Sequence, residues 1–185
     1  MRTVALIAVF VVLAGVFCGG GKPGSQTAKP TTAAVKWPAE ATGTLTEDEL
    51  VQFVKVLPAL SAALKTGNWA PTPPKEGDGP VASLTNFVEG MNVPGLEEAL
   101  KAAGSSWGVL RPTLYKVFAA SAALSVDAAS PEMIAMMKKD TSAAAKKSAQ
   151  EYDTFKAACS QIPEANKQTV AKHQQELQAL QTLGR

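Results

Sequence analysis

The chain has few side chains suited to catalysis: one histidine, His173, and two cysteines, Cys18 and Cys159, among 185 residues. A Cys–His pair activates a thiolate only when the two side chains lie within hydrogen-bonding distance. The helical pattern places His173 about three turns from Cys159, an axial separation of about 15 Å. We therefore expect no cysteine nucleophile and interpret Cys159 as an inert thiol in the core, with a disulfide-linked dimer as the alternative.

Haem ligation by Met and His from different helices is a second possibility. It requires the two side chains to lie at the same height along neighbouring helices. If the last two helices form a hairpin, His173 lies opposite residues 148–152. Met137 and His173 are then about 18 Å apart along the hairpin axis. The sequence also has no Cys-x-x-Cys-His motif. We therefore expect no cofactor and no metal, and interpret the methionines of residues 133–137 as gap fillers in the core. His173 is expected at the core edge, bonded to Tyr152 or to a backbone carbonyl.

The charged side chains favour a role without catalysis. Acidic residues 47–49 and 97–98 fall in the first turns of expected helices, where the helix dipole stabilises them. No carboxylate pair lies on an apolar background that would raise a pKa for acid catalysis. The net charge of +2 gives no basic excess for nucleic acid. The pairs Lys138–Lys139 and Lys146–Lys147 share a face, which we interpret as solvated, with contact to anionic lipid or glycan as the alternative.

Residues 1–17 have the layout of a secretory signal peptide, because Arg2 precedes an uninterrupted apolar run that ends at Phe17. As a helix, residues 3–17 span about 22 Å, which is less than the ~30 Å hydrocarbon layer of a membrane. We expect export followed by cleavage, with an uncleaved anchor as the alternative.

Cys18 stands where the apolar run stops, and three glycines follow it. Leu13–Gly15, separated from Cys18 by Val16 and Phe17, resemble the Leu-small-small box of bacterial lipoprotein precursors, which are lipidated on the Cys and cut before it. The resemblance implies lipidation of Cys18 and, because Gly19 is not Asp, anchoring to the outer membrane facing the periplasm. An ordinary cleaved signal would instead leave the protein free in the periplasm.

The remaining chain divides into a tether and a body. Residues 18–43 are rich in Pro, Thr, Ala and Gly without apolar periodicity, which predicts a disordered tether; Trp37 in it either docks on the body or stays exposed. Residues 44–185 repeat apolar residues at helical spacing, which predicts an all-α domain, an antiparallel helical bundle of four to five helices. We expect helices over 46–67, 106–125, 130–160 and 163–183, with two short ones over 80–89 and 94–104.

Two segments of the body carry a further resemblance. IPEANKQTVAKHQQEL (162–177) and LTEDELVQFVKVLPAL (45–60) are similar to segments of small exported helical proteins of Gram-negative bacteria whose function is uncharacterised, and together they cover roughly a fifth of the chain. The resemblance implies a helical fold and an envelope location, and it implies no activity.

These observations favour a non-enzymatic lipoprotein of the cell envelope that acts as an interaction or assembly module. Its expected partners are the membrane, through the N-terminal lipid, and an unidentified envelope protein, but no nucleic acid. The alternative is a periplasmic carrier of a small apolar ligand or lipid, which needs an apolar pocket. The candidate pocket residues are Trp69, Phe87, Trp107 and Phe118.

Lipidation predicts that labelled palmitate is incorporated into the protein in a Gram-negative host and that Cys18→Ala abolishes the label. The substitution removes the sulfur that accepts the acyl chain. Labelling that is unchanged in Cys18→Ala would contradict the anchor.

Overall fold

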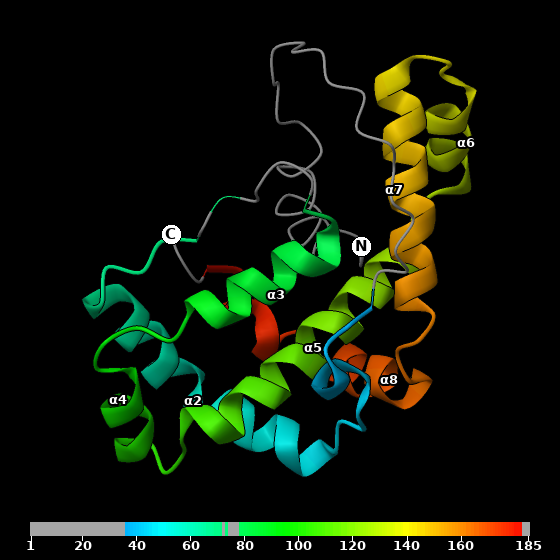
Figure 1. Cartoon of the computed structure of the whole chain (residues 1–185). Coiled ribbons are helices and arrows are strands. Elements are labelled where there is room, and N and C mark those ends of the chain that lie inside the picture. The colour runs from blue at the N-terminus through cyan, green and yellow to red at the C-terminus, as the bar shows by residue number, and fades with distance from the viewer. Residues whose placement is uncertain (1–35, 72, 74–77, 183–185) are drawn as a thin grey trace.

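The computed structural model describes residues 36–71, 73 and 78–182, and over these residues the chain is all-helical, with seven α-helices, two 3-10 helices and no strand (Figure 1). The predicted all-α class is thus confirmed, whereas the bundle of four to five helices is not, because the helices are shorter and more numerous. The predicted signal peptide and Cys18 lie outside the described residues.

In chain order the elements are η1 (Ala39–Thr42), α2 (Glu47–Thr66), α3 (Pro80–Gly90), α4 (Leu96–Ala102), α5 (Trp107–Asp127), α6 (Pro131–Lys139), α7 (Ala143–Cys159), α8 (Glu164–Lys172) and η2 (Glu176–Thr182).

The first long helix begins where the sequence indicates. The backbone N–H of Glu49 donates to Thr46 Oγ1 at 3.2 Å, and Thr46 N–H donates to Glu49 Oε2 at 2.9 Å, which completes the predicted capping box. Leu45 before the cap and Leu50 inside the helix are both buried. The capping box thus satisfies two backbone N–H groups at the start of α2, whose apolar side faces the core.

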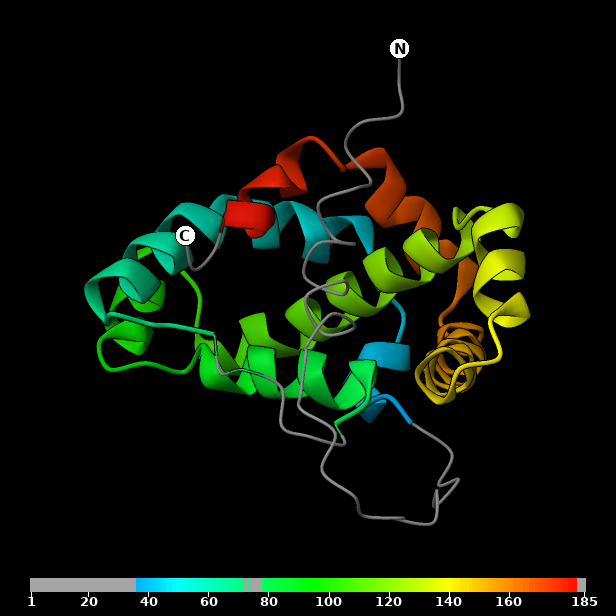
Figure 2. The same cartoon turned by 90° about the horizontal axis from the view of Figure 1, so that it is seen from above.

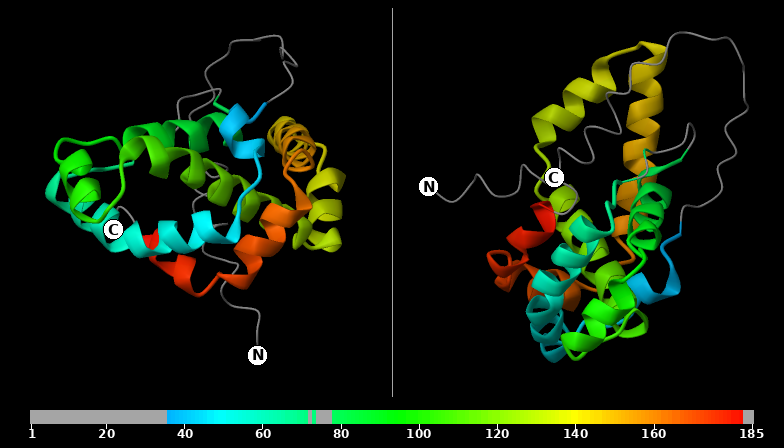
Figure 3. Two further views of the ribbon diagram at one scale, coloured as in Figure 1. Left: turned by 90° about the horizontal axis from the view of Figure 1, so that it is seen from below. Right: turned by 90° about the vertical axis from the view of Figure 1, so that its left-hand side faces the viewer.

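Helix α5 is the centre of the body. It contacts η1, α2, α3, α4, α7 and α8, and the views from above and below show it between them (Figures 2 and 3). Small side chains at Ala119, Ala120, Ala122 and Ala123 are almost completely buried. A helix buried on several sides needs such residues, because small side chains let neighbouring helices approach closely.

The single helix predicted over 130–160 is wrong: it is two helices, α6 and α7, folded against each other. Asp140 Oδ1 accepts from Ser142 N–H at 2.8 Å, and Ser142 Oγ caps α7 by accepting from Ala145 N–H at 3.2 Å. Side-chain bonds of this kind compete with the helical backbone bonds. They therefore stop one helix and start the next within three residues.

The predicted helix over 163–183 also divides, into α8 and the 3-10 helix η2, at a turn that begins at His173. Val170 and Leu177, on either side of the turn, are buried, whereas Gln174 and Gln175 between them are exposed. Helix α8 packs mainly on α5, and η2 packs on α2. The predicted hairpin of the last two helices, and its placing of His173 opposite residues 148–152, are therefore wrong.

Residues 36–43, which the sequence assigns to the tether, pack against the body. The indole Nε1 of Trp37 donates to the carbonyl of Ala158 at 3.1 Å, and its ring lies 6.3 Å from that of Phe155. Ala41 in η1 is fully buried. Trp37 thus docks on the body, the first of the two alternatives that the sequence left open.

The side chain of Asn166 joins this N-terminal segment to α8. Its Oδ1 accepts from Leu45 N–H at 2.8 Å, and its Nδ2 donates to the Gly43 carbonyl at 2.8 Å. Asn166 is fully buried. It therefore satisfies two backbone groups that enter the interior just before α2 begins.

Within the described residues, no helix combines the length and the apolar character needed to cross a bilayer.

Asn166→Ala is expected to lower the free energy of unfolding by about 2–4 kcal/mol, because it leaves two buried backbone groups unpaired and opens a small cavity. Urea denaturation measures the loss. The matched control is Gln168→Ala on the exposed side of the same helix, with an expected change within about 0.5 kcal/mol. Equal stability of the two variants would contradict the role of Asn166.

Candidate functional site

The four residues proposed to line an apolar pocket all pack against the core, and three of them have rings in contact with one another. Trp69, Phe87 and Phe118 form a row of edge-to-face rings, with centroids 5.1 Å apart for the first pair and 5.5 Å for the second. All three are half-buried against the core. Trp107 begins α5, eleven residues before Phe118, which is about 16 Å along the helix.

Trp107 has a different neighbour. Its backbone N–H donates to Glu97 Oε2 at 2.9 Å, so this end of α5 is held to α4. The indole is half-buried. The aromatic row therefore comprises Trp69 from the loop after α2, Phe87 from α3 and Phe118 from α5. Trp107 makes no ring contact with them among the residues that the structure describes.

The cysteine and histidine singled out by the sequence are separate from each other. Cys159 is a free, buried thiol. Burial, reinforced by the charge of Asp127, raises the pKa of this thiol to about 12, so it holds its proton at neutral pH. His173 Nε2 contacts Glu47, and its Nδ1 lies 3.6 Å from Glu176. The predicted bond from His173 to Tyr152 or to a backbone carbonyl is wrong, because the imidazole ties α8 to the first turn of α2.

A polar cluster that the sequence did not indicate links η1, α3 and α5. Arg111 Nη1 donates to Glu89 Oε1 at 2.9 Å, and Nη2 donates to Glu40 Oε1 at 3.1 Å. The buried Tyr115 donates its hydroxyl to the same Glu89 oxygen at 2.6 Å. Two carboxylates engage the one guanidinium, which leaves Arg111 poorly placed to receive an external anion.

The ionisation of Tyr115 points to a structural role for this cluster. Burial first, and then the hydrogen bond and charge of Glu89, raise the pKa of the Tyr115 hydroxyl well above its usual value of 10. A phenol held in its protonated form donates a hydrogen bond, and it cannot act as a base or a nucleophile at neutral pH. The cluster thus fastens η1 and α3 to the central helix.

Helices α6 and α7 form an arm that stands away from the rest of the body (Figures 1 and 3). None of the nine residues of α6 is buried. The side chains of Met133 and Met136 are 45% and 66% exposed. The prediction that the methionines of residues 133–137 fill gaps in the core is therefore wrong for these two, because no element covers the outer side of α6.

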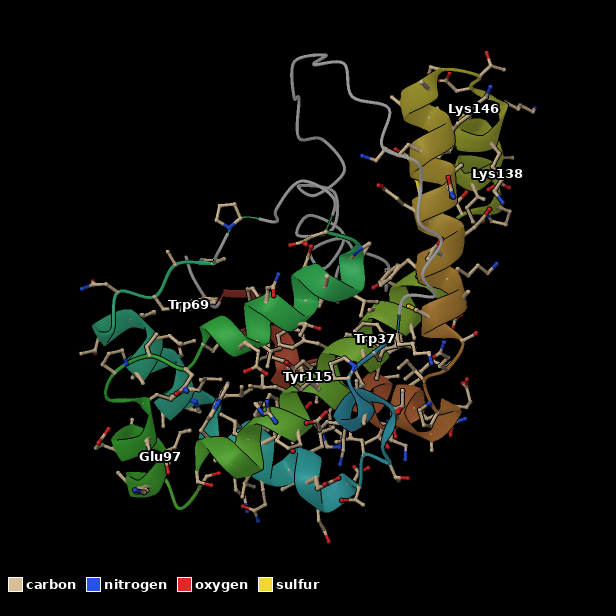
Figure 4. All side chains as sticks on the ribbon, viewed as in Figure 1. Trp37, Trp69, Glu97, Tyr115, Lys138 and Lys146 are labelled. Atoms are coloured by element: carbon tan, nitrogen blue, oxygen red, sulfur yellow. The ribbon has the colours of Figure 1, made fainter. Side chains whose placement is uncertain are left out.

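The arm also carries five lysines, four of them in residues 138–147. Lys138 Nζ lies 2.9 Å from Asp153, and Lys147 Nζ lies 3.8 Å from Glu151, so these two are paired within the arm. Lys139 and Lys146 have no ion-pair partner among the residues that the structure describes. Figure 4 labels Lys138 and Lys146 on the arm, away from Trp69, Tyr115 and Glu97 in the body. The exposed methionines and these lysines make the arm the candidate functional site.

One polar atom lies unsatisfied where the arm meets the body. The hydroxyl of Tyr152 in α7 is buried and has no hydrogen-bond partner in the described part of the chain. Burial, with a smaller effect of the charge of Asp153, raises the pKa of this hydroxyl. An unpaired buried hydroxyl destabilises the fold, so the junction is less well satisfied than the polar cluster around Tyr115.

Over residues 36–71, 73 and 78–182, no group of three or more His, Cys, Asp or Glu side chains is placed to hold a metal ion. Comparison of the chain with protein-family models, with curated proteins and with solved structures finds no match.

The two tyrosines of the chain should respond oppositely to removal of the hydroxyl. Tyr115→Phe loses a hydrogen bond to a carboxylate and should lower the free energy of unfolding by about 1–2 kcal/mol at pH 7. Tyr152→Phe removes an unpaired buried group and should leave stability unchanged or raise it by up to about 1 kcal/mol. Chemical denaturation of both variants measures the difference, and an equal loss in both would contradict this description.

The pH dependence provides a second readout of the same pair. Because its pKa is raised in the folded state, Tyr115 contributes stability below pH 10, and this contribution is lost as the pH rises above 10 and the unfolded chain ionises. The loss is at most about 1.4 kcal/mol per pH unit for one proton. Denaturation between pH 9 and 11 should show a shallower fall in Tyr115→Phe than in the wild type.

Proposed function

We propose that this protein is a non-enzymatic lipoprotein of the cell envelope that presents the α6–α7 arm as an interaction surface. In this proposal, residues 1–17 direct export, lipid on Cys18 holds the protein to the outer membrane facing the periplasm, and residues 18–35 separate the lipid from the helical body. An envelope component binds the arm.

The exposure of α6 carries the proposal. Most helices in globular proteins gain their stability by packing an apolar side against a core, yet α6 buries none of its residues and leaves Met133 and Met136 exposed. Flexible, polarisable methionines are common on binding surfaces that adapt to their partners. The outer side of α6 is thus suited to contact with something other than the body.

The state of the ionisable groups supports binding rather than catalysis. Tyr115, Tyr152 and Cys159 all have a pKa above the usual value, so they are neutral at pH 7. Arg111 is engaged by two carboxylates. A nucleophile or base requires the opposite tuning, which is a pKa near or below the working pH.

A carrier function is the second candidate, and the aromatic row favours it. Trp69, Phe87 and Phe118 are only half-buried, so an apolar ligand could cover their remaining surface. Native mass spectrometry separates the two functions, because a carrier purified from its host should retain the mass of a ligand and an interaction module should not.

Photo-crosslinking in the native host tests the role of the arm. With benzoylphenylalanine in place of Met136, we expect adducts with an envelope component, because this side chain lies on the uncovered side of α6. The matched control is Val109 at the start of α5, which is 67% exposed and therefore as accessible as Met136 at 66%. Val109 is not part of the arm, so we expect adducts at position 136 to exceed those at position 109 about tenfold.

Equal adduct yields at the two positions would show that exposure alone decides the crosslinking, and the arm would lose its proposed role. Circular dichroism of both variants confirms that the helices are intact, since each change replaces a side chain that is mostly in solvent.

A further inference from the structure

We infer that the tip of the α6–α7 arm binds the surface of an anionic phospholipid membrane, the membrane to which Cys18 is anchored. This inference rests on the proposed lipoprotein function and deepens it by naming what the arm contacts. Three features carry it: the distribution of charge, the position of the unpaired lysines beside an exposed methionine, and the place where the N-terminal chain enters the body.

Charge is segregated between the arm and the rest of the chain. The arm, residues 131–159, carries five lysines and four acidic side chains, and its outer part, residues 131–147, carries four of the lysines against Glu132 and Asp140. The other residues of 36–182 carry nine basic and twelve acidic side chains. The outer part of the arm is therefore positive, with a net charge of +2, whereas the body is acidic. A negatively charged surface attracts the arm and repels the body, so electrostatics alone would orient the protein with its arm toward that surface.

The unpaired lysines flank the tip. Lys139 is the last residue of α6, Lys146 lies in the first turn of α7, and the turn between the two helices starts at Asp140. Met136 precedes Lys139 by three residues, so the two side chains are neighbours on one side of α6. Lysine ammonium groups at the level of the headgroups, beside an apolar side chain that enters the interface, are the usual composition of a membrane-surface contact.

The N-terminal chain enters the body at the base of the arm. Trp37 is bonded to Ala158 near the end of α7, and the tip lies sixteen residues from Ala158, about 24 Å along the helix. Eighteen residues lie between Cys18 and Trp37, and a chain of that length reaches at most about 60 Å. The lipid on Cys18 and the tip of the arm can therefore touch the same membrane.

The same geometry favours a membrane over an acidic protein. An anchored lipid places the bilayer within reach of the arm permanently, so even a weak contact is occupied because the effective concentration is high. Two lysines and two methionines at the outer end of the arm are a small surface for a stable protein complex, which typically buries about 800 Å² on each partner.

The test attaches the chain to vesicles chemically, so that the outcome does not depend on acylation in the cell. Residues 18–185 are coupled through Cys18 to a maleimide lipid, and Cys159 stays unreacted because it is buried. A fluorescent amino acid replaces Met136 or, as the matched control, Val109, and nitroxide-labelled lipids quench it on contact. The vesicles are phosphatidylcholine alone or phosphatidylcholine with phosphatidylglycerol.

We expect strong quenching at position 136 on the anionic vesicles, little on the neutral ones, and little at position 109 on either. Lys139→Gln with Lys146→Gln should lower the docked-to-free ratio about thirtyfold, because each lysine near an anionic surface contributes roughly a fivefold increase in binding. The control is Lys55→Gln with Lys65→Gln on α2, which makes the same change of charge away from the arm and should have little effect.

Quenching at position 136 that is equal on neutral and anionic vesicles, or equal loss in the two lysine double variants, would overturn the inference. So would quenching that is absent while the arm crosslinks to a protein or to a second copy of the chain. These results would leave the anchor untouched, because palmitate labelling tests Cys18 separately. Loss of labelling alone would overturn the anchor and leave the contact observed on vesicles.

Discussion

The side-chain amide of Asn166 is the contact on which the assembly of the body depends. Its Oδ1 accepts a hydrogen bond from the Leu45 N–H, and its Nδ2 donates one to the Gly43 carbonyl. These two backbone groups lie where the chain leaves η1 and begins α2. Without that pairing, the N–H of Leu45 and the carbonyl of Gly43 would enter the interior unpaired. Because these buried backbone groups are hydrogen-bonded, η1 and α8 can both pack closely against α5 beside them.

The sequence predicted much of the body, because the relevant signals are local. Thr46 and Glu49 mark the start of α2, and Leu50, Phe53 and Leu57 mark its buried side by their spacing alone. The division of residues 130–160 was missed for a physical reason: the apolar spacing continues through it, whereas the bonds of Asp140 and Ser142 that end one helix and cap the next are decided by single side chains. Apolar periodicity outweighed these turn signals in the prediction.

The candidate site was harder to predict than the fold. Exposed methionines at helical spacing look like core residues until the opposing surface is known, and no opposing surface covers α6. The polar cluster around Arg111 could not be predicted from the sequence, because Glu40 and Arg111 are 71 residues apart in the chain. A signal was present in the composition, since four lysines lie within ten residues of a chain that is otherwise slightly acidic over the body.

The docking of Trp37 has a mechanical consequence. A pulling force on the chain that precedes residue 36 would first act on the indole of Trp37, which is hydrogen-bonded to the carbonyl of Ala158 and lies against the ring of Phe155. The force would therefore arrive on α7 rather than on α2, although α2 follows closely in the chain. Helix α7, which projects from the body, is therefore also the first helix to receive a force applied to the N-terminal chain. Such a force would change the position of the arm before it disturbed α2.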